Sequence, residues 1–488
     1  MTQRTLLSTI VGAALLSATV GACSTPAGDL PSIDEPINLG TPPDAVPATP
    51  QVANGDPQAG FDYLVNGAYI PCGVPHAVFR VLDFLGKAHT SPGSEEQHLD
   101  GRNPDNDGLP YNFTRFKTPA GADLVSNNCL TCHAGHLNGK LIVGLGATDV
   151  DFSHDASNDF DKADLLLRFA LRGEDKKEWE KLRHRMDILA PYSLLQTTGP
   201  TIANMLMPVI MAHHDAQTLE WMDAPAYSLP PPTEIPVDVP PWWNLKKKNA
   251  MFYNAMGRGD FTKHMMLASA FCVDSVPQAR AIHDRFADVK AYVASINPPS
   301  YPFSIDSVHA SKGRRIFTRS CASCHGTYGS KSTFPNRLID IGIVGTDPLL
   351  LSQASLTPDA LAHHAASYFG DGAPSERTHG YLAPPLDGIW ATAPYLHNGS
   401  VPTLRALLDS TRRPRYWSRT FDSLDYNWAD VSWNYTEKDH GKSGEGDGDD
   451  RIRLYDTTLR GYGNAGHLFG DSLTATERDD LLEYLKTL

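Results

Sequence analysis

Apolar residues recur at helical spacing in three long stretches of the chain: 164–189, 200–221 and 278–296. Apolar side chains three and four positions apart form one face of a helix, so each stretch is predicted to be an amphipathic helix. Asn297-Pro-Pro299 ends the third stretch, because proline cannot continue a helix. Alternating patterns typical of strands are scarce. The sequence therefore predicts a mainly α fold with long loops.

Two shorter helices are predicted in the C-terminal part. The last one begins at a capping box, in which the side chains of Thr474 and Glu477 each accept a backbone N–H. Leucines follow it at helical spacing. The other covers residues 311–317, with three residues on one face: Gly313, Ile316 and Phe317.

The first 58 residues differ from the rest of the chain in composition. Residues 1–23 are typical of a lipoprotein-type signal peptide: a basic residue, an uncharged apolar run, and Val-Gly-Ala before Cys23, the residue that such signals lipidate. We expect the lipid on Cys23 to attach the protein to a membrane. The alternative, an uncleaved anchor helix, is disfavoured because the run is short. Residues 24–58 hold eight prolines and are predicted to form a tether. Two folded units follow, 59–300 and 301–488.

The pattern Cys-x-x-Cys-His occurs twice, at 129–133 and at 321–325. It is the attachment signal for c-type haem: the thiols form thioether bonds with the porphyrin, and the histidine becomes an axial iron ligand. Two copies in a chain with seven cysteines predict two covalent haem c groups, in two cytochrome c-type haem domains packed together. The predicted attachment residues are Cys129, Cys132 and His133 for haem 1, and Cys321, Cys324 and His325 for haem 2.

Cys72 and Cys272 are the cysteines that remain once Cys23 and the two motifs are assigned. Haem c is attached outside the bacterial cytoplasm, where disulfides persist. A Cys72–Cys272 bridge and two buried free thiols are therefore equally open interpretations.

The net charge of −14 over 488 residues limits the partners that the chain can have. It argues against nucleic acid and against an anionic membrane surface. It would suit a basic redox protein, although the same charge also promotes solubility.

The order of these features resembles the bacterial di-haem cytochrome c peroxidase superfamily. The resemblance is carried by the first motif, the helices after it, the second motif, and then Ala391-Thr-Ala-Pro-Tyr-Leu-His-Asn-Gly-Ser-Val-Pro-Thr-Leu404. Residues 240–248, 384–390 and 466–470 look closest to the di-haem rubber oxygenase branch, whose typical members are longer. The resemblance covers the chain from about residue 60 onward and implies a haem-dependent oxidoreductase. It does not name the substrate, because function depends on the site rather than on the fold.

The resemblance also bears on the second axial ligand of haem 2. Di-haem peroxidases use methionine there, but the last methionine of this chain is Met266, before the second unit begins. We therefore expect two histidine ligands, a lower reduction potential and an electron-relay role. His467 stands where the rubber oxygenases carry their second ligand, and His397 is the runner-up. The others are expected at the surface or in satisfied core positions: His363, His364, His379 and His440.

Haem 1 is expected to lack a strong sixth ligand, which leaves room for O2 or peroxide. Peroxidases place a distal histidine a short way past the first motif. His136 lies only three residues beyond His133, a span of at most about 10 Å. His154 is far enough along the chain but matches no family pattern. The alternative is that His154 or a methionine fills the position.

Five residues take further roles from the resemblance. Trp242 and Trp243 are expected to carry electrons between the haems, although an aromatic core or a substrate-channel wall is an equal alternative. Trp390 is a second candidate. The peroxidases hold a calcium ion between their haems, and Thr392 and Pro394 match residues whose backbone carbonyls bind it.

Three classes of function follow. The first is an exported oxidoreductase, periplasmic or at the cell surface. In it, haem 1 activates O2 for an apolar organic substrate, or reduces H2O2 with electrons from a periplasmic partner protein. The second is an electron-transfer cytochrome c without catalysis, and the third a maturation enzyme that oxidises another protein at long range. The resemblance to the rubber oxygenase branch favours the first class, the exported oxidoreductase.

Overall fold

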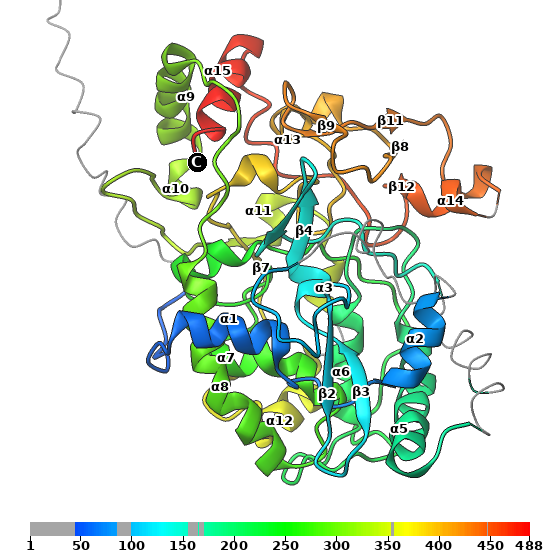
Figure 1. Cartoon of the computed structure of the whole chain (residues 1–488). Coiled ribbons are helices and arrows are strands. Elements are labelled where there is room, and N and C mark those ends of the chain that lie inside the picture. Colours follow the sequence, from blue (N-terminus) through cyan, green and yellow to red (C-terminus); the bar gives the residue numbers. More distant parts are fainter. Residues whose placement is uncertain (1–43, 85–98, 155–163, 165–169, 353–355, 447) are drawn as a thin grey trace, which may run out of the picture.

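The computed structural model describes residues 44–84, 99–154, 164, 170–352, 356–446 and 448–488 (Figure 1). The predicted signal peptide and Cys23 lie outside this part of the chain. The helices are α1 Pro57–Asn66, α2 His76–Phe84, α3 Leu130–His133, α5 Gly173–Leu189, α6 Ala203–Ala212, α7 Phe261–Met265, α8 Val276–Ser295, α9 Ser307–Ser320, α10 Ala322–His325, α11 Ile341–Val344, α12 Pro358–Ala366, α13 Leu404–Leu408, α14 Asp449–Arg453 and α15 Ala475–Leu485.

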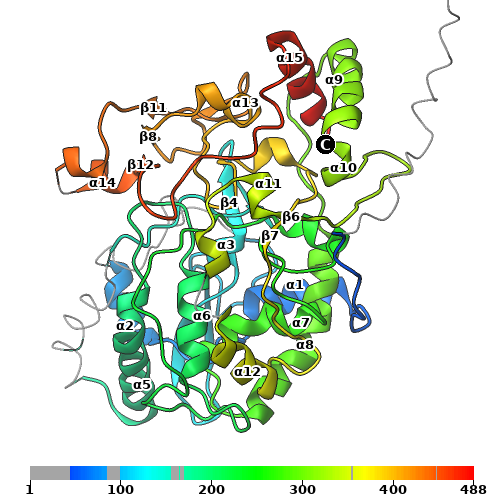
Figure 2. The same cartoon turned by 180° about the vertical axis from the view of Figure 1, so that it is seen from behind.

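Short 3-10 helices connect several of these elements. They are η1 Ala190–Tyr192, η2 Trp242–Lys247, η3 Met266–Phe271, η4 Leu349–Ser352, η6 Ile389–Ala391, η7 Ser410–Arg412 and η8 Lys442–Gly444. Figures 1 and 2 show α1, α5, α6 and α8 in the lower half of the view, and α9, α13 and α15 in the upper half.

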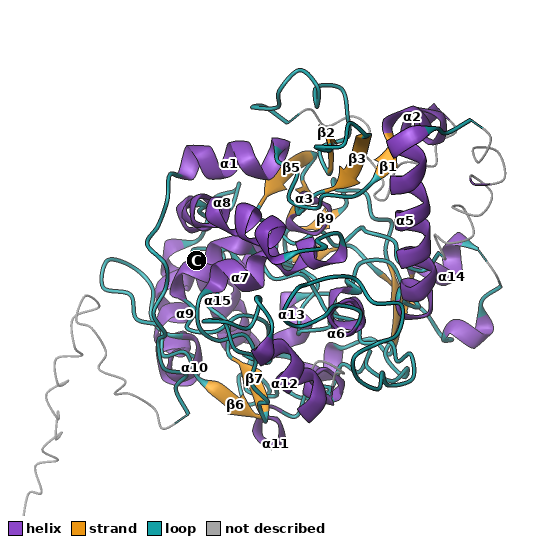
Figure 3. Ribbon diagram, turned by 90° about the horizontal axis from the view of Figure 1, so that it is seen from below, coloured by secondary structure: helices purple, strands orange, loops and turns teal. Residues whose placement is uncertain are grey.

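The strands of the described chain are short, and all of their pairings are antiparallel. They form the sheets β1-β3-β2, β4-β5, β6-β7, β10-β9 and β11-β8-β12 (Figure 3). The structure is thus mixed, with small sheets beside the helices. Strands this short hold too few positions for an alternating pattern to be seen in the sequence. Their bounds are β1 Val74–Pro75, β2 Phe113–Lys117, β3 Asp123–Asn127, β4 Ala134–Leu137, β5 Lys140–Val143, β6 Leu338–Asp340, β7 Gly380–Leu382, β8 Tyr416–Ser418, β9 Tyr426–Asn427, β10 Ser432–Trp433, β11 Thr436–Glu437 and β12 Leu454–Asp456.

Several predicted helices are confirmed. The stretch 278–296 is α8, residues 311–317 lie inside α9, and the capping box of Thr474 and Glu477 begins α15. The stretch 200–221 is helical only in α6, which ends at Ala212.

The reason for the early end of α6 lies in a turn that follows it. The Asp215 carboxylate accepts the backbone N–H groups of Gln217 and Thr218. Such a side-chain turn competes with helical hydrogen bonding.

Helix α9, which leads into the second Cys-x-x-Cys-His motif, crosses α15 at a glycine. A Cβ atom built on Gly313 would overlap the backbone oxygen of Asp480 in α15. The face of α9 that includes Gly313 also buries Ile316 and Phe317, as predicted. Both views place α9 and α15 side by side (Figures 1 and 2).

Helices α1 and α8 repeat this arrangement in the other half. A Cβ atom on Gly60 of α1 would overlap the backbone oxygen of Asp288 in α8. In each half, a helix that precedes the haem motif (α1 or α9) thus packs closely against the last long helix (α8 or α15) at a glycine.

The two halves share their cores. The larger apolar cluster of the C-terminal half includes Trp243, Leu137 and Leu145 from the N-terminal half. Phe369, from the C-terminal half, belongs to the cluster formed by α1, α6 and α8. The predicted boundary lies in the linker between α8 and α9, but packing continues across it.

Residues 44–56 lie along the body of the protein, although we expected a tether over 24–58. Asp44 forms an ion pair with Arg337 at 2.7 Å. Val46 is buried, and its N–H donates to Asn336. Ion pairing and backbone hydrogen bonds thus hold a segment whose composition alone indicated disorder. Only the tether residues before 44 lie outside the described chain.

Cys72 and Cys272 form a disulfide with a Cα–Cα distance of 5.3 Å, and both are buried. This resolves the open pair of interpretations in favour of the bridge. No described helix is long and apolar enough to cross a membrane.

Gly313→Ala tests the crossing of α9 and α15. Helix propensity alone would stabilise the protein by about 0.8–1.0 kcal/mol. The overlap with Asp480 should reverse the sign and lower the free energy of unfolding by about 1–3 kcal/mol. Urea unfolding followed by circular dichroism measures this.

Gly446→Ala, in a loop where a Cβ atom meets no heavy atom within 4 Å, controls for the added methyl group alone. A stabilised Gly313→Ala protein would contradict the close crossing.

Candidate functional site

The first Cys-x-x-Cys-His motif forms α3, between the sheet β1-β3-β2 and the hairpin β4-β5. Cys129 and Cys132 are free thiols, as thioether attachment requires. The Sγ atom of Cys132 lies 4.0 Å from Thr201 Oγ1. The imidazole of His133 stacks on the indole of Trp242, with ring centroids 4.7 Å apart and planes 24° apart.

Gly144 fixes Trp242 beneath His133. Its N–H donates to the carbonyl of His133, and its own carbonyl accepts from the N–H of Trp242, both at 2.8 Å. Gly144 has φ +92°, a conformation that glycine adopts readily. Burial lowers the pKa of His133 to about 4, so the imidazole is neutral at neutral pH, the form that binds a metal.

The second motif forms α10 at the end of α9. Cys321 and Cys324 are also free thiols. The Nδ1 atom of His325 lies 2.8 Å from the carbonyl oxygen of Pro384. This contact requires the Nδ1–H tautomer and leaves Nε2 for a metal, the usual arrangement for a metal-binding histidine.

Residues 384–387, which we call the bridging segment, connect the two motifs. Besides the His325 contact, Pro385 accepts a hydrogen bond from Asn244 Nδ2 at 2.9 Å, and Asp387 accepts one from Trp243 Nε1 at 2.7 Å. The Asp387 carboxylate also pairs with Lys247 at 2.7 Å. One side of the bridging segment is thus bound to η2, whose first residue stacks on His133, and the other side to His325.

Tyr328 adds a second link between the bridging segment and the haem 2 motif. Its hydroxyl accepts the N–H of Leu386 at 2.6 Å and donates to the carbonyl of His325 at 3.0 Å. The positions of both motif histidines therefore depend on the same four residues of backbone.

Trp243 is 1% exposed and packs in the cluster shared by the two halves. Trp242 contacts the haem 1 histidine, and Trp243 contacts the bridging segment. Trp390 packs instead against Tyr301 and Trp428. The pair at 242–243 is therefore better placed between the two motifs than Trp390.

The ring of His467 faces that of His325, with centroids 6.2 Å apart. An imidazole nitrogen lies about 2 Å from a first-row metal that it binds, so two rings on opposite sides of one iron have centroids about 6 Å apart. Burial is the largest cause that lowers the pKa of His467 to about 3, and its Nδ1 is buried without a hydrogen-bond partner within the described chain. These observations fit a neutral imidazole on the far side of haem 2.

The loop of His467 is held by three kinds of contact. The N–H of His467 donates to Val344 at 2.7 Å. Arg413 donates to the carbonyls of Asn464 and Gly466, at 2.7 and 2.6 Å. A Cβ atom on Gly466 would overlap the backbone of Gly345. The position of His467 therefore depends on α11, on Arg413 and on a glycine before it.

The other candidate histidines of the second half have other partners than His325. His397, the runner-up, stacks on Tyr381 at 4.3 Å. His364 is buried in α12 and binds the Ala373 carbonyl, whereas His440 lies between Asp439 and Glu445. His363 contacts the ring of Tyr227, and His379 lies close enough to Asp44 to affect its pKa.

Two histidines, His136 and His154, were considered as second ligands of the haem at His133. His136 lies in β4, with Nδ1 3.0 Å from Asp149 Oδ2, and both side chains are buried. His154 is exposed. Of the described residues, none brings a second histidine ring against His133 as His467 is brought against His325.

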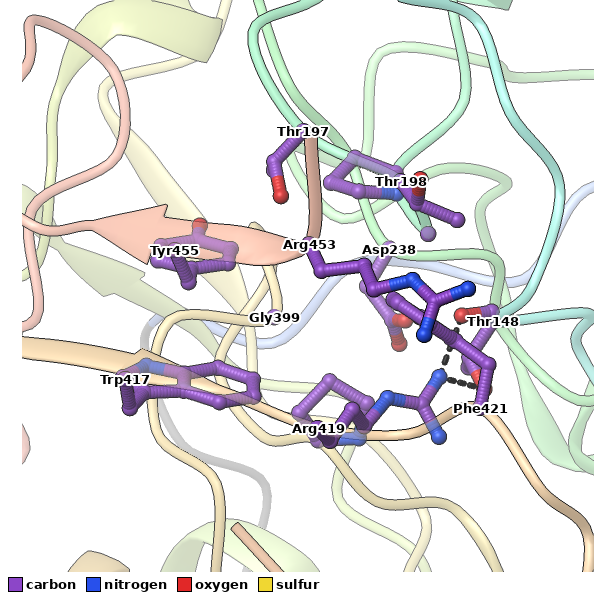
Figure 4. A pocket seen from close by; sticks show the side chains of 13 residues that line it. Thr148, Thr197, Thr198, Asp238, Gly399, Trp417, Arg419, Phe421, Arg453 and Tyr455 are labelled. Carbon is purple, nitrogen blue, oxygen red and sulfur yellow. Dashed lines mark hydrogen bonds between the residues drawn. The ribbon is translucent and has the colours of Figure 1, made fainter. Parts of the chain in front are cut away.

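The calcium site expected at the backbone carbonyls of Thr392 and Pro394 stays a prediction. Thr392 donates to Ile389, and Pro394 lines a cavity together with Asp238 and Arg419 (Figure 4). Arg419 carries a fixed positive charge, which repels a dication. No described cluster of three acidic, histidine or cysteine side chains could hold a metal.

Four residues of the site were not predicted from the sequence: Gly144, Asn244, Lys247 and Tyr328. Asn244 and Lys247 lie within residues 240–248, which resemble the rubber oxygenase branch, so the sequence did mark this stretch. Their partners at 385 and 387 are about 140 residues away, and only the fold shows the pairing.

Comparisons with known proteins match parts of the chain. Residues 380–418, which contain the bridging segment, match a family model described as RoxA-like, cytochrome c-like. Uncharacterized protein y4iM of Sinorhizobium fredii (strain NBRC 101917 / NGR234) is 28% identical over 300 residues, which cover 53% of this chain and 66% of y4iM. Uncharacterized protein y4iJ of the same strain is 28% identical over 265 residues, or 40% of this chain and 41% of y4iJ.

The chain thus covers less than two thirds of the length of either relative. The matched segment supports a relation to the rubber oxygenase-like cytochromes c and implies haem c. The protein is accordingly similar to haem-containing oxidoreductases of that family.

Proposed function

We propose that the chain is an exported di-haem c-type oxidoreductase built from two cytochrome c-type domains. Haem 1, held by Cys129, Cys132 and His133, supplies the reaction with O2 or peroxide. Haem 2, held by its own motif and His467, supplies electron relay. The observation that carries the proposal is the bridging segment, because it binds one motif histidine directly and the other through Trp242 and Trp243.

The contacts of the two motif histidines support different roles. The Pro384 carbonyl accepts the Nδ1–H of His325, which raises the basicity of Nε2. The Nδ1 of His133 has no hydrogen-bond partner among the described residues and faces the indole of Trp242 instead. His467 supports a closed haem 2. The absence of a comparable ring at His133 in the described chain supports an open haem 1.

Export is supported by the Cys72–Cys272 disulfide, because such bridges persist mainly outside the cytoplasm. The lipid at Cys23 and a periplasmic or cell-surface location remain part of the proposal. So does a periplasmic electron donor or acceptor protein.

The runner-up function is an electron carrier without catalysis. It requires a sixth ligand on the haem at His133, from His154, from a methionine or from a residue outside the described chain. The two functions differ in whether added O2 or peroxide is consumed.

Two assays on the haem-loaded protein separate the enzymatic alternatives. With H2O2 and a reduced donor cytochrome, a peroxidase oxidises the donor in many turnovers. With O2 and a polyisoprene latex, an oxygenase consumes O2 and shortens the polymer. The matched 380–418 segment leads us to expect the second result.

Cys129→Ala/Cys132→Ala, which removes the attachment of haem 1, is the control and should abolish activity while haem 2 stays bound. Absence of turnover by the unmodified protein in both assays would favour the carrier.

Trp243→Phe tests the route between the haems. It keeps an aromatic ring but removes the N–H that binds Asp387. We expect the rate of electron exchange between the haems to fall roughly tenfold, about 1.4 kcal/mol in activation free energy. Photolysis of carbon monoxide from half-reduced protein measures this rate.

Trp179→Phe is the matched control, because it also removes a buried indole hydrogen bond, to Asp164 at 3.0 Å. Equal rates in both variants would show that electrons bypass Trp243.

A further inference from the structure

Six aromatic side chains pack together in the second half of the chain: Tyr301, Phe303, Trp390, Tyr426, Trp428 and Trp433. This aromatic cluster has a buried end and an exposed end. Trp390 is 2% exposed, whereas Phe303 is 54% exposed. Tyr301 and Trp428 are partly exposed. The cluster thus extends from the protein interior to its surface.

Neighbouring rings of the aromatic cluster are in contact. The ring centroid of Trp390 is 5.4 Å from that of Tyr301 and 6.2 Å from that of Trp428. Trp428 lies 5.9 Å from Tyr301 and 4.9 Å from Phe303. Packed aromatic rings have centroids roughly 4.5–7 Å apart. A path of ring contacts therefore runs from Trp390 to the surface at Trp428 and Phe303.

The inner end of this path adjoins the bridging segment. Trp390 lies three residues after Asp387, whose carbonyl accepts the indole N–H of Trp243. A Cβ atom on Gly388, between them, would lie 3.1 Å from the Trp243 indole, so this backbone contacts Trp243 directly. Trp243 and Trp390 also belong to the same apolar cluster. The path therefore begins at the backbone that connects the two motif histidines.

Packing alone does not explain the indole at position 390. The hydroxyl of Tyr426 donates to the backbone carbonyl of Trp390, and that of Tyr301 donates to the carbonyl of Trp428 at 3.1 Å. The Nε1 of Trp390, in contrast, is buried and has no hydrogen-bond partner among the described residues. A buried donor without a partner is unfavourable. A phenyl ring would fill the core without this cost, so we looked for a redox role.

The surface around the outer end of the path is more acidic than basic. On the side of Phe303, the N–H of Asp306 binds the Glu483 carboxylate. Further charged groups at this end are two carboxylates that share Arg405 and a lysine over the Tyr301 ring: Asp430, Asp479 and Lys486. Among these groups, four carboxylates stand against two cations. A redox protein with a basic surface is attracted to such a face.

We propose that Trp390, Tyr301 and Trp428 conduct electrons between the two haems and a basic redox protein that docks over Trp428 and Phe303. Tryptophan and tyrosine side chains can give one electron to a strong oxidant and take one back from a reductant. Each electron that the oxidised haems draw from Trp390 is replaced from Trp428 and finally from the reduced partner.

The electrons and protons of this sequence balance. Each H2O2 takes two electrons from the haems and two protons from the solvent and leaves as two water molecules. The partner supplies both electrons, so the aromatic residues are unchanged after a turnover. The proposal rests on the proposed function and adds to it the place where electrons enter.

Pulse radiolysis with azide radicals tests the path without O2 or peroxide. The azide radical takes one electron from an accessible tryptophan, which releases a proton, and becomes azide. In haem-loaded protein with both irons ferrous, oxidised Trp428 should regain its electron from an iron, which becomes ferric, and its proton from the solvent. We expect a first-order phase of haem oxidation in the visible absorbance, with a rate independent of protein concentration.

Three variants locate the path. Trp428→Phe removes the entry point and should abolish the first-order phase. Trp390→Phe interrupts the path farther inside and should slow the phase roughly tenfold. Trp221→Phe is the matched control, at a partly exposed tryptophan of the other half whose N–H also lacks a partner in the described chain. Trp428 is partly exposed and its backbone hydrogen bond is kept, so its variant should fold.

The docking site is tested with a ferric, basic c-type cytochrome, which should take electrons from the ferrous protein. Phe303→Ala should lower the second-order rate constant roughly fivefold. Val81→Ala, at a residue of the other half that is 47% exposed, should leave it unchanged. Stopped-flow absorbance at low and high salt measures this rate constant, which should fall as salt screens the attraction.

Absence of the first-order phase in the unmodified protein, or its survival in Trp428→Phe, would overturn the path. Equal rate constants in Phe303→Ala and Val81→Ala would overturn the docking site. Neither measurement needs turnover with O2 or peroxide. Failure of the proposed enzymatic activity would therefore appear separately, in the two assays described above.

Discussion

The contact between η2 and the bridging segment is the constraint on which the rest of the site depends. Trp243 and Lys247 bind Asp387, Asn244 binds Pro385, and Leu386 donates its N–H to Tyr328. Because Pro384 also binds His325 and Trp242 stacks on His133, a shift of this backbone would move both motif histidines. Electron exchange depends on distance, so a rigid connection of this kind suits two haems that act together.

The helix crossings supply the rigidity that this contact needs. Glycines at 60 and 313 let each motif's leading helix approach the backbone of its partner closely. Side chains from both halves fill the shared cluster around Trp243. The buried guanidinium of Arg419 lies at the same contact and donates to Thr148 of the other half. The halves are therefore joined by apolar packing, by hydrogen bonds and by ion pairs such as that of Lys247 with Asp387.

The sequence predicted those features that depend on residues close together in the chain. The motif spacing, the capping box of Thr474 and the helical face at Gly313 involve neighbours a few residues apart. His467 was found through a resemblance, and its contact with His325 favours that prediction. The short strands, the packed segment 44–56, the pairing of Asn244 with Pro385 and the charge beside Pro394 depend on residues distant in sequence. No periodicity or motif encodes such contacts.

Electron spin resonance of the oxidised protein and of His467→Ala tests the central claim, that one iron is open and the other closed. The account predicts one high-spin and one low-spin ferric haem in the unmodified protein, and two high-spin haems in His467→Ala. His440→Ala, at a half-exposed histidine that pairs with Asp439 and Glu445, should leave the spectrum unchanged. Two low-spin haems in the unmodified protein, or a low-spin signal that survives in His467→Ala, would contradict it.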